Sequence, residues 1–292
     1  MNLSRQIGNT PLIQISEKIY AKAELFNPTG SIKDRPASYI INDAEKRGIL
    51  EKGDTIIEAT SGNMGISFAW LAAERGYKCK IVMPSNMSEE RKQMLRIFGA
   101  DLIEVDAGDF EGAIQLRNKL AEENGWFNCN QFHNPLNIKA HEETTAREII
   151  DQLAVGEKKF IEGFVSGTGT GGTLMGAGLK VKKRVPGMKI IAVEPAESPV
   201  MSGGEPGLHG IQGIGDGSKF LVDLNRVDKI ITISTEEATE RSRRLAKEMG
   251  IFVGISAGAN ILAAERWVLE NKPEGVVVTF LCDRGERYLS CI

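Results

Sequence analysis

The sequence lacks the features that mark several protein classes. Its four cysteines lie far apart and form no CxxC pair, so neither a zinc site nor a disulfide framework is indicated. No apolar run reaches the roughly 18 residues of a membrane span, and the first residues do not resemble a secretory signal. These absences predict a cytoplasmic protein with reduced thiols, no metal and no contact with a membrane.

An excess of basic charge is also missing. The formal net charge is −3, whereas nucleic-acid binding needs a concentrated basic face, so no nucleic-acid partner is expected. The 41% apolar and 26% charged residues are typical of an ordinary globular protein. A chain of 292 residues exceeds the usual size of one hydrophobic core, which favours two lobes with a ligand cleft between them.

Short β-branched runs alternate with longer segments of helical period. This pattern is typical of βαβ units and predicts an α/β fold with open, mostly parallel sheets. We expect strands at 55–59, 79–83, 102–106, 160–165, 189–193, 229–233 and 276–281. We expect helices at 34–47, 65–75, 88–98, 110–123, 139–153, 236–249 and 257–269, several of them closed by a glycine. The polar stretch 151–159 is interpreted as a link between lobes, and 195–224 as a long functional loop.

Lys33 lies between a turn and a predicted helix start, in residues 27–35 (Asn-Pro-Thr-Gly-Ser-Ile-Lys-Asp-Arg). A lysine that is desolvated at such a boundary becomes an amine nucleophile able to form a Schiff base. The commoner alternative is an exposed lysine that opens an amphipathic helix. Two further segments favour the chemical interpretation, namely 60–65 (Thr-Ser-Gly-Asn-Met-Gly) and 167–173 (Gly-Thr-Gly-Thr-Gly-Gly-Thr).

The glycine-rich run 167–173 follows a predicted strand and precedes a helical segment, an arrangement in which backbone N–H groups bind phosphate. Gly167, Gly169 and Gly172 also satisfy GxGxxG, and Glu194 lies where a ribose-binding acid would be, so a nicotinamide-dependent oxidoreductase stays open. The threonine hydroxyls inside the run favour a single phosphate. Lys33 would have no task in a dehydrogenase.

The segment that follows the predicted strand 55–59 also opens a helix. Its hydroxyls and amides, placed at a helix N-terminus, suit the carboxylate of a substrate. A turn that only caps the helix is the structural alternative, and the two interpretations are compatible.

These segments occur together with 7–12 (Ile-Gly-Asn-Thr-Pro-Leu), 131–135 (Gln-Phe-His-Asn-Pro), 254–258 (Gly-Ile-Ser-Ala-Gly) and 284–290 (Arg-Gly-Glu-Arg-Tyr-Leu-Ser). In this order, over nearly the whole chain, they resemble the cysteine synthase (O-acetylserine sulfhydrylase) family. The resemblance implies the type II pyridoxal-phosphate fold, with two twisted sheets flanked by helices, and a homodimer. It also implies a smaller mobile lobe at 34–137 and a larger phosphate-binding lobe at 1–33 and 138–292.

The resemblance assigns roles to individual residues. Lys33 would hold pyridoxal 5'-phosphate as a Schiff base and act as base for the substrate's Cα proton, Asn63 would bond the ring hydroxyl, and Ser256 would face the ring nitrogen. The phosphate would be bound by Gly167, Thr168, Gly169, Thr170 and Gly171. The amino-acid substrate would be contacted by Thr60, Ser61, Gly62, Met64 and Gln131.

The implied reaction is a β-replacement. An activated serine such as O-acetylserine loses its β substituent, and sulfide adds to the resulting aminoacrylate to give L-cysteine. Met64 stands where the family often has threonine. Cys282, expected as an inert thiol near the ring nitrogen, and Asp283 resemble the B-type isozymes, but residues 209–215 are closer to the A-type loop, so the isozyme type stays open.

Asp216 departs from the family pattern, because many relatives have alanine there. We predict that it orients a water or a second amino acid and shifts the reaction toward a cysteine lyase that releases sulfide and gives serine or a thioether. A solvated loop aspartate is the alternative. A serine/threonine dehydratase, a cystathionine synthase and a non-catalytic binding protein on the same fold are more remote.

Overall fold

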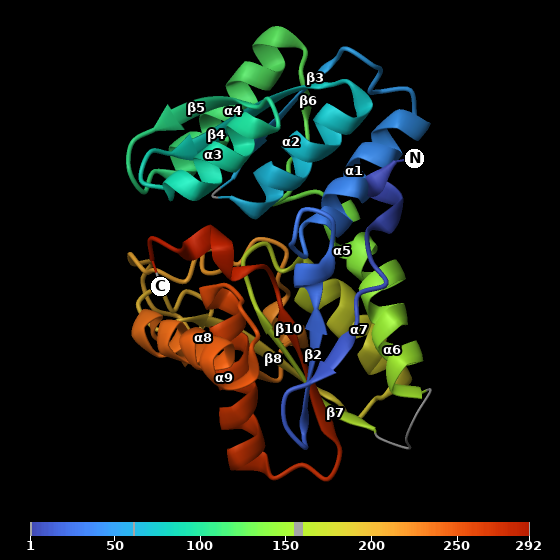
Figure 1. Cartoon of the computed structure of the whole chain (residues 1–292), viewed down its shortest axis with the longest axis vertical. Coiled ribbons are helices and arrows are strands. Elements are labelled where there is room, and N and C mark those ends of the chain that lie inside the picture. Colours follow the sequence, from blue (N-terminus) through green and yellow to red (C-terminus); the bar gives the residue numbers. More distant parts are fainter. Residues whose placement is uncertain (1, 61, 155–159, 292) are drawn as a thin grey trace.

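The chain forms two separate sheets, one above the other in Figure 1. The computed structural model describes residues 2–60, 62–154 and 160–291. The smaller sheet is wholly parallel and has the strand order β5 (Asp101–Val105), β4 (Lys78–Pro84), β3 (Thr55–Ala59), β6 (Phe127–Asn128). The larger sheet has the order β1 (Leu12–Gln14), β2 (Ile19–Ala23), β10 (Val276–Leu281), β7 (Ile161–Gly167), β8 (Lys189–Pro195), β9 (Lys229–Ile233). Its neighbouring strands are parallel except β1 with β2. The predicted fold class is confirmed.

Helices cover both faces of each sheet. On the smaller sheet, α1 (Asp34–Lys46), α2 (Asn63–Arg75) and α3 (Glu89–Ile97) pack on one face and α4 (Phe110–Asn124) on the other. On the larger sheet, α6 (Ala146–Ala154) and α7 (Leu179–Arg184) pack on one face, and α8 (Thr235–Met249) with α9 (Ile255–Asn271) on the other. We call the smaller sheet with α1–α4 the smaller lobe and the remainder the larger lobe. The predicted boundary at 34–137 contains this smaller lobe and otherwise stays a prediction.

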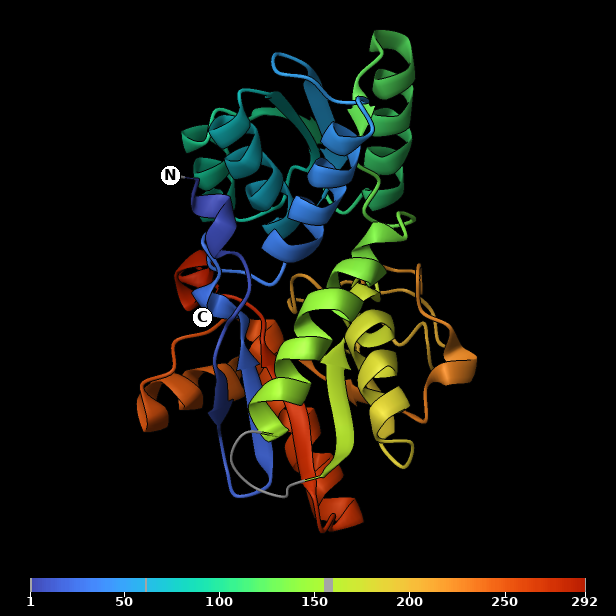
Figure 2. The same ribbon diagram turned by 90° about the vertical axis from the view of Figure 1, so that its right-hand side faces the viewer.

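A continuous helical rod connects the two lobes. It consists of α5 (Leu136–Ala140), a π-helical turn at His141–Thr145, and α6, and Figure 2 shows it running along the larger lobe. The interpretation of 151–159 as a link between lobes is wrong, because α6 and β7 on either side of it both belong to the larger lobe. Residues 155–159 lie outside the described residues. In the part of the chain that is described, no helix is long and apolar enough to cross a bilayer.

Local sequence signals explain several of the helix ends. The strands predicted at 55–59, 229–233 and 276–281 match those of the structure, and the other four differ only at their ends. Gly76, Gly125 and Gly250 close α2, α4 and α8 in the left-handed conformation, with φ of 82°, 64° and 68°. Ser234 and Glu237 form a capping box that starts α8.

Candidate active site

Lys33 immediately precedes α1 and is held from both sides. The Ile32 N–H before it donates to the Cys282 carbonyl at 2.9 Å, which ties the segment to the end of β10. After it, the buried Arg35 side chain pairs with the buried Glu24 at 2.7 Å. Because the backbone is fixed on either side, the fold sets the point from which the Lys33 side chain starts.

The Lys33 amine lines a cavity to which both lobes contribute residues. Burial lowers its pKa, and the nearby Cys282, Asp216 and Asp283 only partly oppose this shift. Within the described residues the amine has no hydrogen-bond or ion-pair partner. A desolvated amine without a partner has the properties of a nucleophile and a general base.

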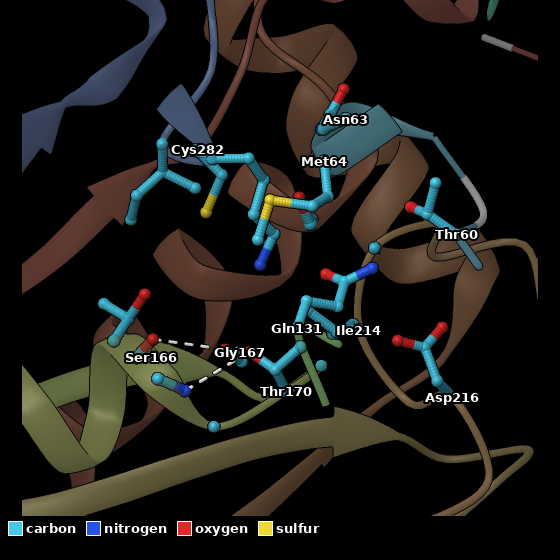
Figure 3. Close-up of a pocket in the computed structure, with 18 of the residues that line it drawn as sticks. Thr60, Asn63, Met64, Gln131, Ser166, Gly167, Thr170, Ile214, Asp216 and Cys282 are labelled. Carbon is cyan, nitrogen blue, oxygen red and sulfur yellow. Dashed lines mark hydrogen bonds between the residues drawn. The ribbon is translucent and has the colours of Figure 1, made fainter. Parts of the chain in front are cut away.

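The same cavity gathers most of the predicted site residues. Figure 3 shows Thr60, Gln131 and Asp216 toward one side of it and Cys282 and Ser166 toward the other. The predicted residues that line it are Lys33, Thr60, Asn63, Met64, Gln131, Gly167, Gly169, Thr170, Gly171, Asp216 and Ser256. Thr168 and Gly62 are not part of the cavity wall as described, and Ser61 lies outside the described residues.

The loop after β7 forms a cradle for an anion. In the described part of the chain, the backbone N–H groups of Gly169, Thr170 and Gly171 have no hydrogen-bond partner. The Thr170 hydroxyl oxygen accepts from the Asn137 amide at 3.0 Å and from the Gly172 N–H at 3.3 Å, which leaves its proton for an acceptor in the cavity. A Cβ on Gly169 would lie 2.6 Å from a carbonyl oxygen, so only glycine fits there.

Two of the predicted phosphate ligands use their donors inside the protein. The Thr168 hydroxyl donates to a carbonyl of β8 at 3.1 Å, and the Gly167 N–H donates to the Asn260 side chain at 2.6 Å. The acid of the nicotinamide alternative, Glu194, accepts N–H groups of the following loop at 2.7 and 3.0 Å and is buried there. The N–H groups of Gly169, Thr170 and Gly171 are therefore the backbone donors of this loop that remain available to an anion, and Glu194 supports the loop that follows β8.

A network that the sequence analysis missed closes the opposite side of the cavity. The Asn63 amide donates to Asp283 at 2.6 Å, and its buried Oδ1 has no partner in the described residues. Tyr288 also donates to Asp283 at 2.5 Å, and it accepts from the Arg91 guanidinium at 2.7 Å. Arg91, only 1% exposed, covers Gly62 so closely that a Cβ there would lie 2.7 Å away. No local motif marks Arg91, because α3 reaches the cavity only in the folded chain.

Ser256 lies in the first turn of α9, and its buried hydroxyl lines the cavity. Close by, burial raises the pKa of the Cys282 thiol to about 12, although a hydrogen bond with Ser256 lowers it slightly. Cys282 is thus a neutral thiol at physiological pH, as the sequence suggested.

Asp216 enters the cavity from the long loop between β8 and β9. The Gly215 N–H before it donates to the Thr168 carbonyl at 2.9 Å, which holds this part of the loop against the cradle. Burial raises the pKa of the Asp216 carboxyl, and Lys33 and other cations around it oppose the shift. The long irregular loop predicted at 195–224 therefore carries a titratable group into the site.

Taken together, a desolvated amine without a partner, an anion cradle and a neutral hydroxyl in one cavity fit an enzyme whose cofactor is a phosphorylated aldehyde. The family model for "Pyridoxal-phosphate dependent enzyme" matches residues 3–283. The chain is 44% identical to the cysteine synthase of Staphylococcus aureus, covering 99% of this chain and 95% of that protein. It is 41% identical to the O-ureido-L-serine synthase of Streptomyces lavendulae, over 97% of this chain and 89% of that one.

The chain is also similar to a solved structure over nearly its whole length. A hydrogen sulfide-producing enzyme from Fusobacterium nucleatum superposes with a TM-score of 0.93 at 41% identity, covering 98% of this chain and 99% of that one. The chain belongs to the family of pyridoxal-phosphate dependent enzymes. Its residues fit the cofactor, since the orphaned N–H groups suit the phosphate, the orphaned Asn63 Oδ1 suits the ring hydroxyl, and the Lys33 amine suits the aldehyde.

Proposed function

We propose that this protein is a cysteine synthase that makes L-cysteine from O-acetylserine, or a related activated serine, and sulfide. The observation that carries the proposal is the position of the Lys33 amine, in one cavity with both the anion cradle and the predicted carboxylate-binding residues. When bound, pyridoxal phosphate supplies an electron sink that makes loss of the Cα proton and of a β substituent possible. The relatives named cysteine synthase support this choice of reaction.

The chemistry of each side chain in the cavity suggests its role in the reaction. Lys33 would accept the Cα proton, because burial holds its pKa below the usual value. Thr60 and Gln131 would bind the substrate carboxylate, and the buried Met64 would limit the size of the side chain that enters. Ser256, a neutral hydroxyl, would leave the ring nitrogen largely unprotonated, which favours loss of the β substituent over transamination.

Product analysis tests this function. The purified protein loaded with pyridoxal phosphate should form L-cysteine from O-acetylserine and sulfide, and much less from serine and sulfide, because acetate is the better leaving group. The control is the same protein without sulfide, which should give no thiol. Absence of L-cysteine with each activated serine would reject the proposal.

We also propose a cytoplasmic homodimer, for which the family resemblance is the support.

A second candidate function is the release of sulfide from L-cysteine. Its support is Asp216, a carboxylate in the Lys33 cavity whose pKa is raised by burial, together with the similarity to a hydrogen sulfide-producing enzyme. The Cβ–S bond of cysteine would break with loss of hydrogen sulfide, and the carboxylate would then take a proton from water as the water oxygen bonds to Cβ. Overall, cysteine and water give serine and hydrogen sulfide. Because only the ionised carboxylate accepts a proton, this activity should rise as the pH passes the raised pKa.

Asp216→Asn should reduce sulfide release from L-cysteine by about 100-fold, since general-base assistance typically contributes on the order of 10² or more. Synthesis of cysteine from O-acetylserine should change far less, because sulfide needs no base. Lys219→Ala, an exposed change in the same loop, is the matched control. Equal rates of sulfide and serine formation in Asp216→Asn and wild type would exclude the role of Asp216.

A further inference from the structure

Asn260 is a fully buried polar side chain next to the site that none of the roles above includes. It lies on α9 four positions after Ser256, hence on the same helix face, and does not itself line the cavity. Its Oδ1 accepts the Gly167 N–H at 2.6 Å, and its Nδ2 donates to the Phe280 carbonyl at 3.1 Å and to the Cys282 sulfur at 3.3 Å. The amide group thus bonds two separate parts of the cavity wall.

The two parts serve different ends of the cofactor site. Gly167 ends β7 and begins the cradle, whereas Cys282 follows β10 and lies beside Ser256. Figure 3 shows Gly167 and Cys282 on different segments of the wall. A Cβ on Gly167 would lie 3.2 Å from the Asn260 oxygen, so the backbone of the cradle is packed directly against this amide.

We propose that Asn260 is a positioning residue, which fixes the start of the phosphate cradle relative to the Ser256–Cys282 side of the cofactor site. The proposal rests on the site assignment made above. Asparagine suits this position because its uncharged amide presents an acceptor to Gly167 and a donor to β10 at any pH, without having to bind or release a proton. Without it, the Gly167 N–H and the Phe280 carbonyl are left buried and unsatisfied, and the cradle is free to shift.

The test compares Asn260→Ala with Thr279→Val in the full-length protein. Thr279 is equally buried on β10, donates a hydrogen bond to a β7 carbonyl at 3.0 Å, and does not line the cavity. Both variants therefore lose buried hydrogen bonding near the same strands. The readouts are the dissociation constant of pyridoxal phosphate, the ³¹P chemical shift of its bound phosphate, its visible absorption maximum, and the melting temperature.

Both variants should melt at lower temperature, but only Asn260→Ala should raise the dissociation constant, by about tenfold or more, and move the ³¹P and visible signals. In Asn260→Ser the hydroxyl is too short to reach both Gly167 and β10, so the ³¹P and visible signals should move in the same direction as in Asn260→Ala. This variant replaces Asn260→Ala in the test if the alanine variant does not fold. The proposal is overturned if the Asn260 variants bind the cofactor like Thr279→Val with wild-type spectra. A wild-type protein without bound phosphate would instead reject the site assignment.

Discussion

Lys33→Ala should lower the rate of cysteine formation from O-acetylserine by at least about 10³-fold, because the variant loses both the nucleophilic amine and the base for the Cα proton. The protein should stay folded, since its neighbours and not the amine hold this segment, through the bond from Ile32 to Cys282 and the pair between Arg35 and Glu24. The visible absorption of the covalently attached cofactor should disappear. Rate assays and absorption spectra of the cofactor-loaded proteins check both results.

Lys33→Arg is the matched control for this result. It keeps a cation in the cavity but cannot attach to an aldehyde or accept a proton at neutral pH, so it should be as inactive as the alanine variant. Phosphate binding is expected to survive in both variants, because the N–H groups of Gly169, Thr170 and Gly171 are untouched, and a ³¹P signal of bound cofactor would show it. Substantial activity in either variant would exclude Lys33 as the reacting amine.

The sequence pattern predicts the strands that have at least five residues and are rich in β-branched residues. The runs at 55–59 and 276–281 are β-branched and almost completely buried, so their pattern is unambiguous. The three missed strands give weaker signals. β1 and β6 have three and two residues, and β2 has the buried Lys22 as the fourth of its five residues. A lysine in a sequence predicts an exposed position, because its burial depends on an ion-pair partner, here Glu148, that is distant in the sequence.

Some residues of the candidate site could be predicted from the sequence and others could not. Lys33 was singled out by its place between a turn and a predicted helix start, whereas Ser256 was named only through the family resemblance, and both residues line the cavity. Arg91 and Asn260 were not found, because neither lies inside a motif and each makes its contact with a residue distant in the sequence, Tyr288 for Arg91 and Gly167 for Asn260. The sequence also does not show that the Thr168 hydroxyl donates to the protein itself, because its acceptor, the Val193 carbonyl, lies on the neighbouring strand β8.

Loss of the buried ion pair of the smaller lobe should strongly destabilise the protein. Glu58 and Arg117 are each 1% exposed and lie 2.7 Å apart, and Glu58 also accepts the N–H of Gln131 at 2.9 Å. Arg117→Met keeps much of the volume but leaves a buried carboxylate without its cation, which should lower the free energy of unfolding by about 3–5 kcal/mol. Because Gln131 lines the cavity, the KM for O-acetylserine should rise as well.

The sign of the pH dependence separates a lost ion pair from lost packing. In the wild type burial raises the pKa of Glu58 while Arg117 opposes that shift, so without Arg117 the pKa rises further. Between the lower unfolded pKa and the higher folded pKa, the folded variant keeps a proton on Glu58 that the unfolded chain has already released, so the stability of the variant falls as the pH rises through this range. Urea unfolding should therefore show that the variant loses more free energy of unfolding, relative to the wild type, at about pH 8 than at about pH 5.

Lys119→Met removes an exposed pair with Glu123 on the same helix, and it should show neither this loss of stability nor its pH dependence. A deficit in Arg117→Met that is equal at both pH values would mean that the two charges do not stabilise the smaller lobe as a pair.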